Sequence, residues 1–542
     1  MTLTLPFVRY AACGGSALVL TGLAVVGCGA TPVALTREAG QGASSGAGIG
    51  GDRMPGSEVS GKENPGKESL GKEVPGSGGA SESVSGGDVP VSQAPVSQAP
   101  VSEVSAEERP NVLVLIADDL RHDALSATGN PWIETPSLDR IVEEGVLFER
   151  AYVTTSRCCP SRASFLTGRY SHIHGVEDNV TPVDFQVEHP TYPEVLQAAG
   201  YRTGYIGKWH IPAASGGPGP RAGFDRWVSY EGGGSHFDEV FNIDGETVPS
   251  SGYQADVLTD RAIEFLQAEP DQGAGDEPFL LVVGFKNPHG PLEPAPRHLG
   301  QLEGSYLSLP PSAQDPVDSL LPLYRRLRQQ RSSPHSIGDP DAFLTDCRRY
   351  WELVLSIDDN VGRLLEALEA SGELDETVVI FTSDNGLMLG EHGLRQKGVA
   401  YEPSIRIPLA VRYPTVAKAG GRSRSAALNV DLFPTLLELC GVDAALPLDG
   451  LSLVPQLRDP ARPGRDQFLY VGPRFSGASE RAVVGEEWKY VRVASKRGEQ
   501  EALFHLAEDP AERVNLIGDH SSGPVLERLR AVMDAEALRL GL

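Results

Sequence analysis

Cysteine is scarce in this chain, which has only six in 542 residues. They are Cys13, Cys28, Cys158, Cys159, Cys347 and Cys440. So few cysteines in so long a chain exclude a small scaffold held together by a framework of disulfide bonds. A hydrophobic fraction of 40% instead indicates a large core and more than one structural unit.

Basic residues are also in short supply. The sequence has 47 Lys and Arg residues against 73 Asp and Glu residues, which gives a formal net charge of −26. A protein of this charge repels phosphate backbones and has no basic stripe along which DNA or RNA could lie. We therefore expect no nucleic-acid partner.

The N-terminal segment is typical of an export signal. Arg9 precedes an apolar run at 11–27, and small residues lead to Cys28. A helix that stays in the membrane is an alternative, although the run is near the lower length limit for a span. The end of the run is similar to a bacterial lipobox, whose cysteine is lipidated after cleavage. We expect a signal peptide at 1–28 and a lipoprotein on the periplasmic or cell-surface membrane, anchored only through Cys28, with a secreted soluble protein as the alternative.

Residues 29–108 have the composition of a linker. They are rich in Gly, Ser, Pro and Glu, and Gly-Lys-Glu recurs at Lys62, Lys67 and Lys72. A segment of this kind cannot bury enough apolar surface to fold. We expect a disordered, low-complexity linker that spaces the following globular part from the membrane.

Four apolar segments predict the strands of a mostly parallel sheet. They lie at 111–117, 201–206, 279–285 and 377–382, and polar residues follow each one. Helical patterns alternate with them at 137–144, 192–198, 254–267 and 350–370, as in a layered α/β fold. Because open sheets of this kind bind ligands outside the carboxyl ends of their strands, we expect the polar residues to converge on one pocket.

The residues after the first and fourth strands are hard oxygen ligands. Asp118 and Asp119 follow the first strand, and Asp384 and Asn385 follow the fourth. Three carboxylates brought together repel one another unless a divalent cation neutralises them, and oxygen ligands favour Ca²⁺ or Mg²⁺. A turn and helix cap is an alternative for Asp118 and Asp119 alone. A second acidic ending on a separate strand favours the metal site.

The most specific pattern is Cys158-Cys159-Pro160-Ser161-Arg162-Ala-Ser-Phe-Leu-Thr-Gly-Arg169. It resembles the signature C-x-P-S-R-x-x-x-L-T-G-R of the sulfatase family, with every fixed position filled. In that family the cysteine is oxidised after translation to Cα-formylglycine, and the aldehyde hydrate is the nucleophile. Pro160 and Arg162 stand at the required offsets from Cys158, so the resemblance implies that Cys158 is modified and that Cys159 is a bystander. Two buried cysteines before an ordinary helix are the alternative.

The resemblance covers most of residues 110–520. Other segments that match family elements are Gly-Lys-Trp-His at 207–210, Pro-His at 288–289, and the blocks 383–386, 390–397 and 401–408. The implied fold is that of the alkaline-phosphatase superfamily, an α/β catalytic domain at 109–460 with a mostly parallel central sheet flanked by helices. A C-terminal subdomain at 461–542 would carry a small antiparallel sheet and a helix.

The resemblance also implies roles for individual residues. The catalytic set is Cys158, Arg162, Lys208, His210, His289 and Lys397, and the metal ligands are Asp118, Asp119, Cys158, Asp384 and Asn385. Ca²⁺ is expected in preference to Mg²⁺. In the implied mechanism, a hydroxyl of the hydrated formylglycine attacks sulfur while the cation and both lysines hold the sulfate oxygens. His289 then protonates the leaving sugar oxygen, His210 deprotonates the second hydroxyl to release sulfate, and Arg162 stabilises the hydrate.

These roles meet the chemical demands of the reaction. Sulfate esters resist hydrolysis because their negative oxygens repel nucleophiles and their leaving alkoxide is poor, so a site must supply positive charge and a proton donor. A start of a helix near Cys158 would also direct its positive end at the sulfate. Interior packing for each histidine, and a surface position for each lysine, are the alternatives.

The expected function is therefore hydrolysis of a sulfuric ester on a sulfated sugar or polysaccharide, after maturation by a formylglycine-generating enzyme. Segments 154–164 and 241–245 resemble sulfatases that act on glucosamine 6-sulfate. One alternative is a phosphate or phosphonate ester hydrolase of the same superfamily. Another is a lipoprotein that binds sulfated glycan without turnover, which predicts the loss of at least one site residue, and none is missing.

Overall fold

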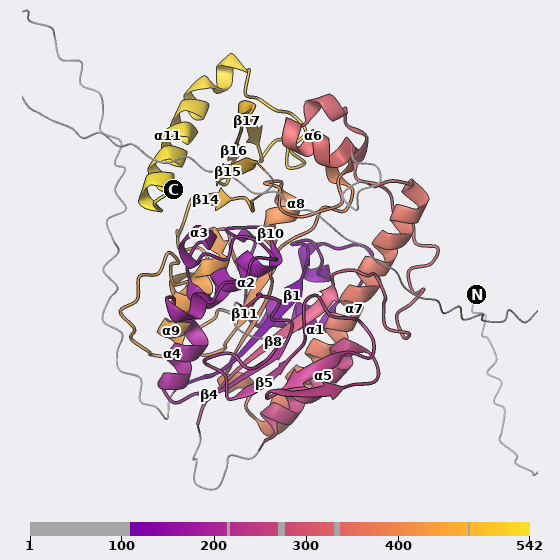
Figure 1. The fold of residues 1–542 in the computed structure, drawn as a ribbon, viewed down its shortest axis with the longest axis vertical. Coiled ribbons are helices and arrows are strands. Elements are labelled where there is room, and N and C mark those ends of the chain that lie inside the picture. Colours follow the sequence, from indigo (N-terminus) through magenta and orange to yellow (C-terminus); the bar gives the residue numbers. More distant parts are fainter. Residues whose placement is uncertain (1–108, 214–216, 269–276, 330–336, 475–476) are drawn as a thin grey trace, which may run out of the picture. The chain divides into compact units, whose positions relative to one another are not determined.

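The computed structural model describes residues 109–213, 217–268, 277–329, 337–474 and 477–542 (Figure 1). The predicted signal peptide at 1–28, the lipidation site Cys28 and the predicted linker at 29–108 lie outside the described residues. Within the described ranges, no helix has both the length and the apolar character that a membrane span requires.

A ten-stranded sheet forms the centre of the fold, in the order β12-β2-β11-β9-β1-β8-β4-β5-β6-β7. The four predicted strands are its middle members: β9 (Thr377–Ser383), β1 (Asn111–Asp118), β8 (Phe279–Pro288) and β4 (Arg202–Gly207). They pair in parallel, and almost all of their residues are buried, as their apolar sequences require. Their carboxyl ends therefore meet at one edge of the sheet.

The outer strands of the sheet are short and were not predicted. They are β2 (Val146–Phe148), β11 (Leu409–Arg412), β12 (Gly421–Ser423), β5 (Arg226–Ser229), β6 (Val240–Ile243) and β7 (Glu246–Pro249). Several of their pairings are antiparallel, including β9 with β11 and β5 with β6. Runs this short show too little periodicity to be recognised in sequence.

Helices cover both faces of the sheet (Figure 1). On one face, α1 (Pro136–Glu144), α5 (Gln254–Leu266) and α7 (Pro340–Ser371) bury residues in one hydrophobic cluster. On the other face, α2 (Cys158–Thr167), α4 (Tyr192–Ala198) and α9 (Leu432–Leu439) contribute to a second cluster. The predicted layered α/β architecture is confirmed, and α7 begins earlier than its predicted start at 350.

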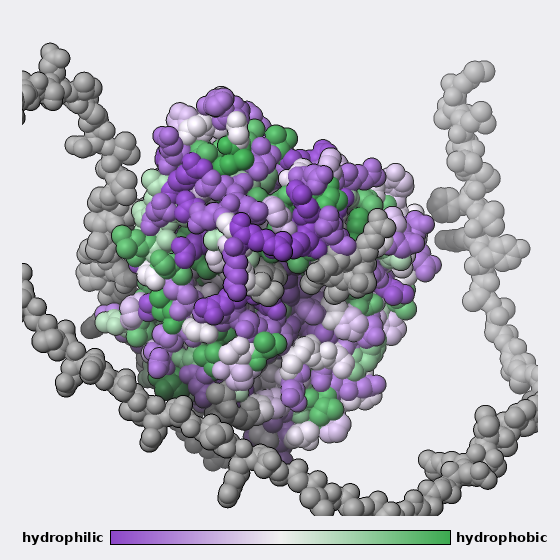
Figure 2. Space-filling view, turned by 45° about the horizontal axis from the view of Figure 1, so that its top comes forward, coloured by the Kyte–Doolittle hydropathy of each residue, from purple (hydrophilic) through white to green (hydrophobic). Residues whose placement is uncertain are grey.

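Short elements complete this part of the chain. A three-stranded sheet joins β10 (Arg406–Ile407), β3 (Ala151–Tyr152) and β13 (Ala427–Leu428). The short helices are α3 (Ser171–His174), α6 (Pro322–Gln329), α8 (Glu402–Ile405) and α10 (Val454–Arg458). The face of the molecule in Figure 2 is mostly hydrophilic, and its hydrophobic residues lie in scattered groups.

The C-terminal part contains the predicted small antiparallel sheet and helix. The sheet consists of β14 (Phe468–Val471), β15 (Ala478–Val484), β16 (Trp488–Ser495) and β17 (Gly498–His505). Helix α11 (Gly523–Arg539) shares one hydrophobic cluster with this sheet, to which Leu529 and Met533 belong. Other residues of the sheet share a different cluster with α6 and with the chain segment 388–405. This second cluster links the C-terminal sheet to a segment that carries a predicted site residue, Lys397.

Candidate active site

The polar residues after the central strands meet at the carboxyl edge of the sheet. The backbone N–H of Asp119, just beyond β1, donates to Asp384 Oδ1 at 3.2 Å, although 265 positions separate the two residues. Asn385 Nδ2 donates to Asp119 Oδ1 at 2.5 Å. Lys208 follows β4 and forms an ion pair with Asp118. The predicted convergence on one location is therefore confirmed.

Cys158 is the first residue of α2 and is fully buried. Its Sγ lies 3.5 Å from Asp118 Oδ1 and 2.7 Å from Lys397 Nζ. The N-terminus of a helix carries a partial positive charge, so an anion bound beside Cys158 would be stabilised there. Cys159 faces elsewhere, because its Sγ contacts the carbonyl of His210 at 3.2 Å and its N–H donates to Asn179 Oδ1.

Each of the three carboxylates has a cationic partner. Lys208 pairs with Asp118, Lys397 pairs with Asp119, and Arg162 Nε lies 2.8 Å from Asp384 Oδ2. Arg162 also donates from Nη1 to the carbonyl of Lys208 at 2.6 Å. The site thus places three positive side chains among its acidic residues, as a site for an anionic substrate requires.

Burial and charge shift the pKa values of these groups in opposite directions. Burial raises the pKa of Asp118, but Lys208 and the other nearby cations outweigh it and hold that pKa well below its usual range. For Asp384, burial and repulsion from Asp118 raise the pKa to about 7, against the attraction of Arg162. The two carboxylates therefore differ in proton affinity, because Asp118 lies next to a lysine and Asp384 beside an already ionised acid.

The oxygen atoms of the site fit a hard divalent cation. One ligand atom from each of Asp118, Asp119, Cys158 and His289 lies within 4.8 Å of the others. Asn385 Oδ1 is buried without a hydrogen-bond partner among the described residues. A buried carbonyl oxygen without a donor is costly, and a cation would satisfy it. This cluster includes His289, which was not a predicted ligand. It does not include the predicted ligand Asp384, whose two carboxylate oxygens accept hydrogen bonds from the Asp119 N–H and from Arg162.

The two predicted proton-transfer histidines differ in environment. Burial, followed by the charge of Lys208, lowers the pKa of His210 to about 2, so its imidazole is neutral at pH 7. The side chain of His289 is 31% exposed, and its Nε2 lies 3.7 Å from Asp119 Oδ2. His289 Nδ1 lies 2.8 Å from the carbonyl of Gly290. Because a carbonyl only accepts, Nδ1 carries a hydrogen and Nε2 is the atom that can exchange a proton.

Several contacts around the site were not predicted. The hydroxyl of Tyr350, in the N-terminal half of α7, donates to the carbonyl of Asp119 at 2.7 Å. His236 Nε2 lies 2.9 Å from the carbonyl of His289. Lys286 Nζ donates to the carbonyls of Gly233 and Gly290, and burial lowers the pKa of Lys286 to about 8. Lys286 was visible as a polar residue at the end of a strand, whereas Tyr350 lies in an apolar helical pattern that carries no functional signal.

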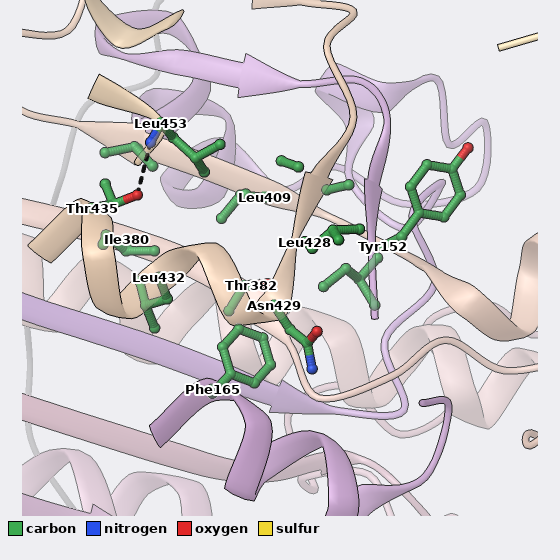
Figure 3. A pocket seen from close by; sticks show the side chains of 14 residues that line it. Tyr152, Phe165, Ile380, Thr382, Leu409, Leu428, Asn429, Leu432, Thr435 and Leu453 are labelled. Carbon is green, nitrogen blue, oxygen red and sulfur yellow. Dashed lines mark hydrogen bonds between the residues drawn. The ribbon is translucent and has the colours of Figure 1, made fainter. Parts of the chain in front are cut away.

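An internal cavity lies apart from this site (Figure 3). Its lining is mostly apolar and includes Phe165 of α2, Ile380 of β9, Leu409 of β11 and Leu432 of α9. None of the predicted site residues is part of that lining. The cavity is therefore an apolar packing feature, separate from the predicted site residues.

Comparison with known proteins agrees with this geometry. The sequence profile of the family described as Sulfatase matches residues 110–442, and that described as N-sulphoglucosamine sulphohydrolase, C-terminal, matches residues 390–538. An N-acetylglucosamine-6-O-sulfatase of Bacteroides thetaiotaomicron is 31% identical over 476 residues, which cover 76% of this chain and 83% of that protein.

Two solved structures resemble the fold. One is a protein in complex with its substrate D-glucosamine-2-N,6-O-disulfate, with a TM-score of 0.73 and 29% identity over 80% of this chain and 98% of that chain. The other is a phosphonate monoester hydrolase of Agrobacterium radiobacter, with a TM-score of 0.66 and 22% identity over 80% of this chain and 96% of that chain. At that lower identity the second likeness concerns the fold alone.

Proposed function

Because this chain belongs to the sulfatase family, we propose that its substrate is a sugar carrying a 6-O-sulfate on glucosamine. The chain is a sulfatase with the α/β fold of the alkaline-phosphatase superfamily. The substrate proposal is supported by the relative from B. thetaiotaomicron, whose name specifies N-acetylglucosamine 6-O-sulfate. The bound D-glucosamine-2-N,6-O-disulfate of the similar structure supports the same sugar.

One observation carries the proposal for the site. Cys158 lies at the first position of α2 within the complete family signature, with Lys397 Nζ at 2.7 Å and Asp118 Oδ1 at 3.5 Å from its Sγ. A bound Ca²⁺ would add positive charge to the site, and its ligands would be Asp118, Asp119, Asp384 and Asn385. A formylglycine made from Cys158 would supply the nucleophilic hydroxyl. His289 lies in the same cluster, but it is assigned to proton transfer, because a ring nitrogen bound to a cation could not also donate a proton.

The remaining residues supply charge and proton transfer. Lys208 and Lys397 hold the sulfate oxygens, because both are cations beside Cys158; Lys208 is fully buried and Lys397 is partly buried. Burial works against their charge, but Asp118 raises the pKa of Lys208 and Asp119 that of Lys397, so both are charged at neutral pH. Arg162 stabilises the nucleophile from its position beside Asp384.

The two histidines divide the proton transfers. His289 donates a proton from Nε2 to the departing sugar oxygen when its ring is doubly protonated, since Nδ1 carries the hydrogen that faces the carbonyl of Gly290. Its pKa is lowered by burial, although Asp118 and Asp119 partly oppose that effect. His210 accepts a proton, because its low pKa keeps it neutral. The assignment of the acid agrees with the Asp119 carboxylate oxygen 3.7 Å from His289 Nε2, which favours the protonated form of that ring.

The test is release of inorganic sulfate from defined sugars. The protein is co-expressed with a formylglycine-generating enzyme, supplied with Ca²⁺, and assayed on glucosamine 6-sulfate and its 3-sulfate isomer. We expect faster release from the 6-sulfate and none from a Cys158→Ala control. Mass spectrometry verifies that the assayed protein carries formylglycine. If this protein hydrolyses phosphonate esters but releases no sulfate, the proposal is contradicted and the phosphorus-ester alternative is favoured.

We also propose that the mature chain is a lipoprotein attached through Cys28. The small residues before this cysteine support the proposal. Metabolic labelling with a radioactive fatty acid tests it in a bacterial host. The full chain should carry label and fractionate with membranes, whereas Cys28→Ser should carry none; an unlabelled full chain in the soluble fraction would support secretion instead.

A further inference from the structure

The segment that carries Lys397 is held by two residues from outside the site. The N–H of Ala400, three positions after Lys397, donates to the hydroxyl of Tyr324 at 3.2 Å. The carbonyl of Ala400 accepts from Lys489 Nζ at 2.9 Å. Tyr324 belongs to α6 and Lys489 to β16 of the C-terminal sheet. Both backbone polar groups of Ala400, its N–H and its carbonyl, are therefore held by hydrogen bonds.

Both holding residues are themselves buried and anchored. Lys489 is 0% exposed, and its Nζ lies 2.8 Å from a carboxylate oxygen of Glu402 and 2.8 Å from one of Glu512. The Tyr324 hydroxyl, also buried, hydrogen-bonds to Glu480 of β15. Removing either holding residue would leave buried carboxylates without their partners, which is strongly unfavourable. The anchors therefore have little freedom to move.

A third contact ties the same segment to the nucleophile. The N–H of Gly398 donates to Ser156 Oγ at 3.2 Å, and that hydroxyl donates to the carbonyl of Ser404 at 2.6 Å. Ser156 lies two positions before Cys158 in the sequence. The segment from Gly398 to Ser404 therefore has a defined position relative to Cys158.

We propose that Tyr324 and Lys489 are positioning residues that hold the Lys397 ammonium at the distance from Cys158 at which it binds a sulfate oxygen. The C-terminal sheet is thereby part of the catalytic apparatus through its contact with Ala400, although it supplies no group to the site itself. This inference rests on the proposed function, in which Lys397 binds sulfate. It gives a chemical reason for the burial of Lys489 between the carboxylates of Glu402 and Glu512.

The first test replaces Tyr324 by Phe in the full, matured chain. Phe keeps the ring that packs beside Tyr401, at 4.9 Å between centroids, but leaves the Ala400 N–H without its acceptor. We expect kcat/KM for sulfate release to fall roughly tenfold to a hundredfold, as for other displacements of a catalytic group by about 1 Å. In a Lys397→Ala background the same substitution should cause no further loss, because the ammonium that it displaces is gone.

The matched control is Tyr170→Phe. The Tyr170 hydroxyl is also buried and donates to a backbone carbonyl, that of Leu469 in β14, at 2.9 Å. The Tyr170→Phe substitution removes a buried hydroxyl at the C-terminal sheet but leaves the contacts of the segment 397–404 intact. We therefore expect kcat/KM to stay within about twofold of wild type. A folded Tyr324→Phe protein with wild-type kcat/KM, or with an equal loss in both Lys397 backgrounds, would overturn the proposal.

Hydrogen exchange of the wild-type chain keeps the proposal open to test if Tyr324→Phe does not fold. The Ala400 amide should exchange as slowly as the amides inside β16, and exchange at the rate of an exposed loop would overturn the proposal. This measurement needs no substrate. If the Ala400 amide exchanges slowly but no sugar yields sulfate, the proposed function has failed, whereas the contacts of Ala400 with Tyr324 and Lys489 are present.

Discussion

Asp119 adopts a left-handed backbone conformation, with φ of 67°. Such a φ is uncommon outside glycine and tends to persist only where the surroundings enforce it. Here the Tyr350 hydroxyl contacts the Asp119 carbonyl, and the next N–H, that of Leu120, donates to Ser383 Oγ at 2.9 Å. The unusual backbone thus directs the carboxylate of Asp119 toward Lys397 and Asn385. The orientation of the Asp119 carboxylate therefore depends on Tyr350 of α7, which is distant in the sequence.

Replacing Tyr350 by Phe should weaken cation binding. The substitution removes the hydrogen bond to the Asp119 carbonyl while the ring keeps its place beside Trp351. Loss of an outer contact of this kind typically lowers metal affinity by about tenfold or more. Calorimetric titration of Ca²⁺ into chelator-treated protein measures the affinity, with Tyr170→Phe as the control. An unchanged Kd in the Tyr350 variant would show that Asp119 holds its conformation without the hydroxyl.

Helix α7 shows how local capping sets the limits of an element. Asp339 Oδ1 accepts from the N–H groups of Asp341 at 2.9 Å and Ala342 at 3.0 Å, and Pro340 occupies the first helical position. These are strong signals for the start of a helix, and they explain why α7 begins ten positions before the predicted limit at 350. The earlier start places Tyr350 inside the helix and not at its first position, and the Tyr350 hydroxyl contacts the Asp119 carbonyl.

Asp339→Ala should loosen the first turn of α7. Loss of the cap leaves two N–H groups without an intrachain acceptor, at a cost of about 1 kcal/mol. Hydrogen exchange at Asp341 and Ala342 should then speed up roughly fivefold, since 1.4 kcal/mol corresponds to a factor of ten. Asp339→Asn keeps an oxygen acceptor and should exchange as the wild type does. Equal exchange rates in the alanine and asparagine variants would contradict the capping role.

At the scale of the whole molecule, buried charge joins the C-terminal sheet to α8, because Lys489 of β16 pairs with Glu402. Lys489 of the C-terminal sheet lies among Glu402, Glu480 and Glu512, and burial raises the pKa of Glu480 to about 7 despite its hydrogen bond with Tyr324. A buried acid with a raised pKa binds protons more strongly in the folded chain than in the unfolded chain. Its contribution to stability therefore becomes less favourable as the pH rises from about 4.5 to about 7.

Glu480→Gln should stabilise the protein at pH 8 more than at pH 5. The amide keeps an oxygen for the Tyr324 hydroxyl but carries no charge, so it avoids a burial cost of up to about 3 kcal/mol at the higher pH. Urea denaturation at both pH values measures the difference. Glu499→Gln, at an exposed position of β17, makes the same change of charge and should show no such pH dependence. A Glu480 variant with the same effect at both pH values would contradict the raised pKa.

The central strands, and the residues predicted to form the site, could be read from the sequence, whereas the contacts of those residues could not. Buried parallel strands need continuous apolar runs, and the signature around Cys158 is a contiguous pattern, so both leave a local trace. The pairing of Arg162 with Asp384, 222 positions apart, leaves none, and neither do the contacts of Ala400 with Tyr324 and Lys489. Such contacts depend on strand order and on how helices and a second sheet pack against the strand ends. Those are properties of the folded chain, because long-range packing joins residues whose local sequences carry no mark of each other.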